Sequence, residues 1–258
     1  MKVAIIISGK DTAGRNIKEQ LEKIGLSNKF STEQAELFLN YVNEDSIRCE
    51  NIDKEIDADL FVFATKHASK SKIPSLTVHA PGNIGSALYG GKENLICIAA
   101  ERYIKRCFQL LSQKKPEGFD AIQEATHHGP LIEKPCFFIE LGSDEEGWKN
   151  KEGAKAVAET IIECFSTPIS ECKTAIGIGG MHHSPNFAKI MRGNEYAISH
   201  VCAKYNLEFL DEEMLNQMIN RSMTPAEKIF LDWKGLGEHK ERIKSLVEKT
   251  GIAWEKIK

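Results

Sequence analysis

Histidines recur where apolar runs of the sequence give way to turns. His79 ends one such run, the adjacent pair His127 and His128 ends another, and the pair His182 and His183 follows a third. In open α/β sheets, ligands bind in the crevice beyond the carboxyl ends of the strands. Imidazole serves both as a metal ligand and as a general base near neutral pH. We therefore predict that these histidines converge on one site.

The paired histidines need a break in the backbone. Neighbouring side chains of a regular strand face opposite sides, so an extended pair cannot send both rings into one pocket. Gly129-Pro130 follows the first pair and Ser184-Pro185 follows the second. A single histidine is more often a hydrogen-bonded structural residue, whereas two pairs in equivalent settings favour a functional role. His200, at the end of the short apolar stretch 196–199, is a further candidate.

Two glutamates interrupt apolar strands. Glu140 lies within the run 137–141, where a carboxylate needs a metal, a histidine or a cationic substrate group as a partner. The alternative is that Glu140 points outward at the end of its strand. Glu124, within 121–126, raises the same question, with a stronger case for a structural role. The residues that we predict to be catalytic are His127, His128, His79 and Glu140.

Basic and glycine-rich turns supply candidate contacts to the substrate. Residues 10 and 11 follow the first predicted strand, although Asp11 alone would also fit the N-cap of a helix. The loop 66–72 is basic and suits phosphate groups, or it is simply a solvated surface. Glycines at 179 and 180 allow a close approach of the backbone. The predicted substrate-binding residues are Lys10, Asp11, Lys66, Gly179 and Gly180.

Several other chemistries are excluded. The chain lacks the G-x-S-x-G elbow of serine esterases and the H-E-x-x-H zinc motif, and its phosphate-loop and dinucleotide patterns are incomplete. The seven cysteines contain no C-x-x-C spacing, so we expect reduced, buried thiols. The formal net charge of −3 gives no overall attraction to nucleic acid. An RNA partner would have to be held by a local basic patch or by shape.

Strand-like and helix-like segments alternate along most of the chain. This alternation predicts an α/β fold with a mainly parallel sheet, covered by helices on both faces and forming a single domain over residues 1–258. A capping-box pattern at Ser143 and Glu146 predicts the start of one helix, and Asp211 predicts the start of another. The predicted strands are 3–8, 59–64, 76–79, 121–126, 136–141, 174–178 and 229–233. The other predicted helices are 94–111, 186–191, 212–221 and 240–249.

No apolar run approaches the roughly 20 residues that cross a bilayer. The apolar stretch at the N-terminus is too short for the hydrophobic region of a signal peptide, and no small-residue cleavage site follows it. We therefore expect a cytosolic protein.

Six segments together resemble one known family. Ala125–Pro130 (ATHHGP), Phe138–Ser143 (FIELGS) and Gly177–Pro185 (GIGGMHHSP) resemble motifs of the archaeal and plant-type D-aminoacyl-tRNA deacylases. Ser75–His79, 198–201 and 232–236 resemble further family segments, in the same order over essentially the whole chain. At His183 the family motif often has an aromatic residue such as tyrosine.

The resemblance implies a phosphorylase/hydrolase-like, three-layer α/β/α sandwich with a mainly parallel, mixed sheet, related to bacterial-type peptidyl-tRNA hydrolase. It implies hydrolysis of the ester between a D-amino acid and the terminal ribose of tRNA, with the acceptor end of D-aminoacyl-tRNA as the partner. We expect a monomer that does not bind membranes. The family is described as zinc-binding, and the candidate ligands here are His182, His200 and His127.

Two other functions fit parts of the same pattern. A zinc-dependent amidohydrolase or peptidase acting on a small substrate would use the same histidines without an RNA surface, which agrees with the net charge. A non-catalytic module that binds tRNA or nucleotides is disfavoured, because such a module has little use for several histidines. No aromatic stacking platform is evident in the sequence either.

Overall fold

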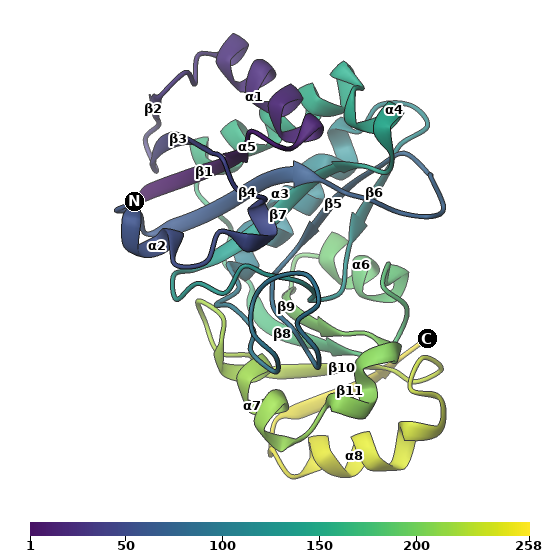
Figure 1. Cartoon of the computed structure of the whole chain (residues 1–258). Coiled ribbons are helices and arrows are strands. Elements are labelled where there is room, and N and C mark those ends of the chain that lie inside the picture. The colour runs from purple at the N-terminus through teal and green to yellow at the C-terminus, as the bar shows by residue number, and fades with distance from the viewer.

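The computed structural model describes all 258 residues and contains two β-sheets (Figure 1). The larger sheet is mixed: β2 and β3 pair antiparallel, as do β5 and β7, and its other pairs are parallel. In spatial order its strands are β2 (Lys29–Ser31), β3 (Glu36–Val42), β1 (Lys2–Ser8), β4 (Leu60–Lys66), β7 (Cys136–Gly142), β5 (Ser75–His79) and β6 (Asp120–Gln123).

The smaller sheet has four parallel strands and occupies the other half of the molecule (Figure 1). In spatial order these are β11 (Ala253–Ile257), β10 (Lys228–Asp232), β8 (Lys173–Ile178) and β9 (Tyr196–Cys202). The predicted α/β class, with a mainly parallel, mixed sheet and flanking helices, is confirmed. The alternation does not run through one sheet, however, because the strands after α5 form the second one.

One face of the large sheet is covered by α1 (Thr12–Ile24), α3 (Glu101–Lys114) and α5 (Lys151–Ser166). Side chains of alternate strand positions, such as Ile5, Val62 and Phe137, pack there with Ile17 and Phe108 of the helices. These strands are apolar on both faces, as expected for strands that are buried on both sides. The opposite face is covered by a smaller apolar cluster and by the connections between strands.

The opposite face of the large sheet positions the site. Phe63 and Phe138 stack there with ring centroids 4.7 Å apart, next to the short helix α2 (Ile52–Glu55). Side chains two residues apart in a strand share a face, so Glu140 emerges beside Phe138. Thr77 pairs with Glu140 and His79 pairs with Phe138, so the end of β5 lies on the same face. Polar residues thus begin where the apolar cluster ends.

Helices also flank the smaller sheet. Helices α7 (Glu212–Asn220) and α8 (Lys240–Glu248) pack on β8 and β10 through residues such as Met218 and Val247. Helix α6 (Pro185–Arg192) contributes Phe187 to the largest hydrophobic cluster, which contains residues from both halves of the molecule. No helix is long and apolar enough to span a membrane.

Two helices begin where the sequence predicts, and two begin elsewhere. Asp11 caps α1 and Asp211 caps α7, each accepting a hydrogen bond from a backbone N–H of the first turn. The prediction that a capping box at Ser143 starts a helix was wrong. Asp144 caps the short helix α4 (Glu145–Trp148) and Asn150 caps α5, whereas the Ser143 hydroxyl donates to the Ile73 carbonyl at 2.5 Å.

The helix predicted from residue 94 begins only at Glu101. Asn94 lies in a turn, with a φ of 54°, and residues 95–100 are held by backbone hydrogen bonds to other segments. Cys97 N donates to the Pro81 carbonyl at 3.1 Å, and Ala99 N donates to the Arg221 carbonyl at 2.9 Å. These long-range bonds outweigh the local helical spacing.

Candidate active site

Glu124 is the centre of a histidine cluster at the junction of the two sheets. It follows β6 directly, and its side chain is completely buried. Its Oε1 atom lies 3.0 Å from His182 Nε2, 3.1 Å from His183 Nε2 and 3.3 Å from His67 Nδ1. His67 follows β4 of the large sheet, whereas His182 and His183 follow β8 of the small one. One carboxylate therefore joins side chains from both sheets.

The backbone around Glu124 explains this position. Glu124 N donates to the Val78 carbonyl at 3.0 Å and so extends the pairing of β6 with β5. The next residue turns to the other sheet, where Ala125 N donates to the His182 carbonyl at 2.9 Å. Thr126 N donates to the Val201 carbonyl, also at 2.9 Å. The segment 124–126 thus bridges the two sheets and brings their histidines together.

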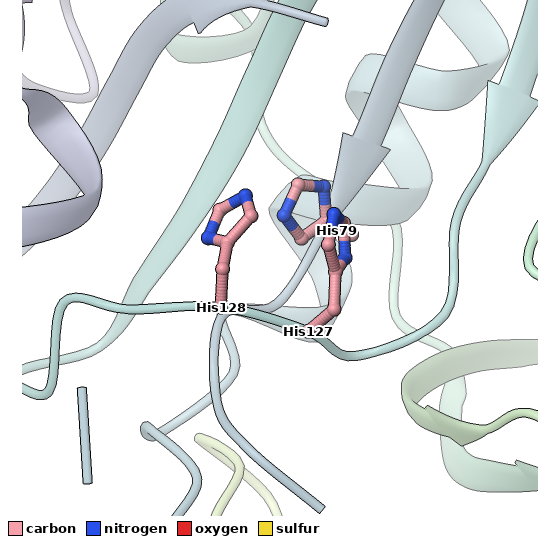
Figure 2. A group of neighbouring side chains, drawn as sticks. All are labelled: His79, His127 and His128. Atoms are coloured by element: carbon pink, nitrogen blue, oxygen red, sulfur yellow. The ribbon is translucent and has the colours of Figure 1, made fainter. Parts of the chain in front are cut away.

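His79, His127 and His128 form the second part of the cluster, with their rings gathered beside the end of β5 (Figure 2). The ring centroid of His127 lies 4.2 Å from the ring centroid of His79 and 4.2 Å from that of His128. His128 has a φ of 46°, in the left-handed region that L-residues rarely adopt. This turn removes the alternation of an extended strand, so both neighbouring rings reach the same site.

Hydrogen bonds fix the tautomers of the neighbouring pair. His127 Nδ1 donates to the Ala125 carbonyl at 2.8 Å, and His128 Nδ1 donates to the Gly129 carbonyl at 2.7 Å. The proton therefore lies on Nδ1 in each neutral ring, and Nε2 carries a free lone pair. Burial lowers the pKa of His128 to about 4 and also lowers the pKa of His127. Both imidazoles are neutral at physiological pH.

Glu140 and His67 lie together beside these neutral rings. Glu140 accepts a hydrogen bond from the Thr77 hydroxyl at 3.0 Å, and its Oε2 lies 3.4 Å from His67 Nδ1. Burial raises the pKa of Glu140 to about 7. Burial alone would lower the pKa of His67, but its hydrogen bonds to Glu124 and Glu140 outweigh this effect and raise it to about 10. His67 is therefore a buried imidazolium.

Four buried polar atoms of the cluster have no hydrogen-bond partner. They are both ring nitrogens of His79, Nε2 of His67 and Oε2 of Glu124. Buried polar atoms are nearly always paired, and a group of unpaired ones indicates an ion or ligand site. A cavity of about 450 Å³ opens from the cluster, and its wall includes His67, His127, His128, Glu140 and His182. The arrangement can therefore receive a small polar group beside several neutral imidazoles.

The convergence that the sequence predicts is present, but not at the expected edge. Strand β5 runs antiparallel to β7, so its carboxyl end lies opposite the carboxyl ends of β1, β4 and β7. His79 therefore lies near the start of β7, and Glu140 lies within that strand. The cluster is consequently built on the face of the large sheet where the small sheet meets it.

His200 does not belong to the cluster, and its prediction as a metal ligand was wrong. It is fully buried in β9, where Nε2 donates to the Arg221 carbonyl at 2.7 Å. Its Nδ1 accepts a hydrogen bond from the Thr126 hydroxyl at 3.1 Å. Both ring nitrogens are therefore occupied, and neither is left for a metal. His182 and His127 do lie together, with ring centroids 4.4 Å apart.

The predicted substrate contacts divide into two groups. Lys66 and Asp11 line the cavity, but the Asp11 carboxylate already accepts from Gly14 N, the Thr65 hydroxyl and Lys66 N. Its role is to cap α1 and hold the end of β4. Lys10 lies outside the cavity wall and forms an exposed ion pair with a glutamate at 3.3 Å.

Gly179 and Gly180 lie behind the site and do not line the cavity. Both have positive φ, and they pack tightly against the turn after β10. A Cβ on Gly179 would lie 2.8 Å from the Asp232 carbonyl oxygen. These glycines therefore support the turn that carries His182, and their role as substrate contacts stays a prediction.

Sequence reasoning undervalued two residues at the centre of the site. Glu124 was favoured as structural, and His67 was grouped with the lysines of a surface loop. His67 is only 4% exposed, because the chain turns inward directly after β4 and its backbone N–H donates to the Leu141 carbonyl at 2.9 Å. The available signal was a lone histidine among lysines at the end of a buried strand.

Comparisons with known proteins identify relatives over the whole chain. A family model described as D-aminoacyl-tRNA deacylase matches residues 54–255. The D-aminoacyl-tRNA deacylase of Pyrococcus furiosus is 35% identical over 272 residues, covering 99% of this chain and 100% of that protein. The D-aminoacyl-tRNA deacylase of Archaeoglobus fulgidus is 33% identical, over an alignment that covers 93% of this chain and 90% of that protein.

The fold has a close counterpart among solved structures. The crystal structure of a conserved protein of unknown function, AF0625, superposes with a TM-score of 0.88 at 31% sequence identity. The match covers 99% of this chain and 95% of that chain. Both sheets therefore have counterparts in an experimentally determined fold.

Proposed function

The chain belongs to the D-aminoacyl-tRNA deacylase family, and from this membership we propose that its junction cluster hydrolyses D-aminoacyl-tRNA. The products are the free D-amino acid and tRNA. The observation that carries the proposal is the buried Glu124 carboxylate, which gathers imidazoles from both sheets beside a cavity. The curated relatives named above are deacylases, so the small-substrate amidohydrolase or peptidase is set aside.

The chemistry needs only a few groups, because an aminoacyl ester is already activated. A water must be deprotonated as it attacks, and the negative charge that develops on the carbonyl oxygen must be stabilised. The free Nε2 lone pairs of His127 and His128 can accept the water proton. The imidazolium of His67 has an Nε2–H without a partner in the protein, so it can donate to the oxyanion.

Glu140 is our candidate partner for the α-ammonium group of the substrate. It lines the cavity, and its position relative to the imidazoles would fix the ammonium and the carbonyl together. The chirality of the amino acid is then read from the direction in which its side chain must leave.

Glu140→Gln is expected to lower kcat/KM for D-Tyr-tRNA by about 10- to 100-fold, because a hydrogen bond to a charged group is lost. The matched control is N-acetyl-D-Tyr-tRNA, which lacks the ammonium group. Glu140→Gln should lower the rate on this substrate less than the rate on D-Tyr-tRNA, because Glu140 also contacts His67. If Glu140→Gln left both binding and turnover of D-Tyr-tRNA unchanged, the assignment would be wrong.

We further propose that His79, His127 and His128 bind zinc. One donor nitrogen from each of the three lies within 4.8 Å of the others, and both His79 nitrogens are buried without a partner. The Nδ1 hydrogen bonds of His127 and His128 to carbonyls are the outer contacts that orient metal-binding imidazoles. Bound zinc would occupy the Nε2 lone pairs of these rings and would lower the pKa of a coordinated water, which could then lose its proton to solvent without the rings acting as the base.

Zinc content measured on purified protein tests this second proposal. The wild type and His239→Ala, which alters a histidine outside the cluster, should each hold about one zinc per chain, as expected for a three-histidine site. His79→Ala should lose the metal. Equal zinc content in His79→Ala and wild type would rule out this donor set.

The substrate also defines the setting of the reaction. We propose that the acceptor end of the tRNA enters the cavity. We also propose that the enzyme acts in the cytosol, where aminoacylated tRNA is used. Because each chain contains the complete cluster, we also propose that the protein acts as a monomer.

Deacylation assays with D-Tyr-tRNA and L-Tyr-tRNA test the proposed function, each run with and without a chelator. We expect rapid release of D-tyrosine and slow release of L-tyrosine. Equal rates on the two enantiomers would contradict the function. Indifference to the chelator would contradict a catalytic role for zinc and leave the imidazoles as the base.

A further inference from the structure

Tyr89 is an exposed aromatic side chain on the wall of the catalytic cavity. It is 65% exposed, yet it lines the same cavity as His127 and His128. Apart from the histidines, it is the one aromatic residue on that wall. An aromatic ring that faces both solvent and a reactive site is well placed to contact a ligand.

The backbone that carries Tyr89 is firmly held. Gly129 N, directly after the histidine pair, donates to the Tyr89 carbonyl at 2.9 Å. Asn83 Nδ2 donates to the Gly90 carbonyl at 2.9 Å. Gly90 has a φ of 76°, and a Cβ there would lie 1.8 Å from the Ile47 carbonyl oxygen, so the turn packs without room for a side chain. The ring is therefore presented at a fixed distance from the catalytic pair.

A positive charge lies on the same cavity wall. Lys66, at the end of β4, lines the cavity, and its ammonium group forms no ion pair. It lies 5.7 Å from the centre of the Trp148 ring. Proteins that bind single-stranded nucleic acid combine a π-face for a base with cations for the backbone. No stacking platform is evident from the sequence, because Tyr89 stands in a glycine-rich loop without other aromatic residues.

We propose that Tyr89 stacks on the terminal adenine of the tRNA substrate, while Lys66 contacts the adjoining phosphate. This inference rests on the proposed function and names a substrate-positioning residue for it. The ester lies on the ribose that carries this adenine, so a base held beside the histidine pair brings the ester to the imidazoles. The contact is independent of the amino acid and serves every charged tRNA alike.

Three variants test the role of the ring: Tyr89→Ala, Tyr89→Phe and the matched control Leu88→Ala. Leu88 is the preceding residue in the same loop, is 73% exposed and lies outside the cavity wall. Tyr89→Ala should raise KM for D-Tyr-tRNA by about 10-fold or more, since base–aromatic stacking is lost. Tyr89→Phe keeps the π-face and should restore KM to the wild-type value. Leu88→Ala should behave as wild type.

Calorimetric binding of adenosine monophosphate separates this inference from the proposed function. The wild type and Tyr89→Phe should bind this nucleotide, and Tyr89→Ala should bind it about 10-fold more weakly. Equal affinities in wild type and Tyr89→Ala would overturn the stacking role, whether or not D-Tyr-tRNA is hydrolysed. An equal rise in KM in Leu88→Ala and Tyr89→Ala would also overturn it, because the effect would then belong to the loop. A wild type that binds the nucleotide but hydrolyses no D-Tyr-tRNA would refute the proposed function and leave the stacking role supported.

Discussion

At the scale of single residues, the site depends on one buried carboxylate that keeps its charge. Burial favours the neutral form of Glu124, but hydrogen bonds from His182, His183 and His67 hold its pKa well below the usual range. His67 balances this charge as an imidazolium shared with Glu140. Burial keeps His79, His127 and His128 neutral beside this pair, and neutral rings are the form that accepts a proton or binds a metal.

The charge on His67 predicts a pH-dependent stability. Its folded pKa of about 10 lies above the ordinary histidine value of 6.5, so its contribution to stability is complete below pH 6.5 and is lost as the pH rises through 10. His67→Gln should therefore destabilise the protein most at pH 6, by about 3 kcal/mol, since a buried pair is broken. Urea unfolding at pH 6, 8 and 10 should show this difference shrinking. The control His239→Gln should show no such trend, and a constant deficit in His67→Gln would contradict the assignment.

Residue types alone identified several members of the site. The placement of His79, His127, His128 and His182 at the ends of apolar runs was sufficient to predict that they meet. The roles of Glu124 and His200 were reversed, because each depends on which hydrogen-bond partners the sheets supply. Sequence neighbours do not reveal that the Arg221 carbonyl occupies His200, or that Glu124 faces another strand's imidazoles.

At the scale of elements, the direction of a strand decides where its end residues lie. The positions of β1, β4, β5, β7, β8 and β10 followed from their apolar runs. The antiparallel direction of β5 did not, because apolar spacing is the same in either direction. The edge strands β2 and β11 are short and largely exposed, so they lack the continuous apolar run that marks a buried strand.

Asp11 gives an element-scale prediction. Its carboxylate caps α1 through Gly14 N at 3.0 Å and also ties the end of β4 through Lys66 N at 2.7 Å. Asp11→Ala should lower the free energy of unfolding by about 2 kcal/mol, the upper range for loss of a helix cap. Asp45→Ala is the control, because Asp45 stands at an N-cap without a side-chain cap hydrogen bond. Chemical denaturation of both variants checks this, and equal losses would show that capping is not the cause.

At the scale of the whole molecule, the site exists only where the two sheets meet. The large sheet supplies His67, His79 and Glu140, and the small sheet supplies His182 through the turn after β8. The alternation of strands and helices predicted the α/β class, but it does not show where one sheet ends and another begins. That division follows from the pairing of β8 with β9 and β10 rather than with any strand of the large sheet.

The most direct test of this account is the single-turnover rate of D-Tyr-tRNA hydrolysis by Glu124→Gln. The substitution keeps the size of the side chain but removes the charge that gathers imidazoles from both sheets. The rate should fall by about 100-fold or more, the usual effect of disrupting acid–base groups. Glu93→Gln, which alters an exposed glutamate outside the site, should match wild type. A Glu124→Gln rate within about twofold of wild type would contradict the claim that this junction is the hydrolytic site.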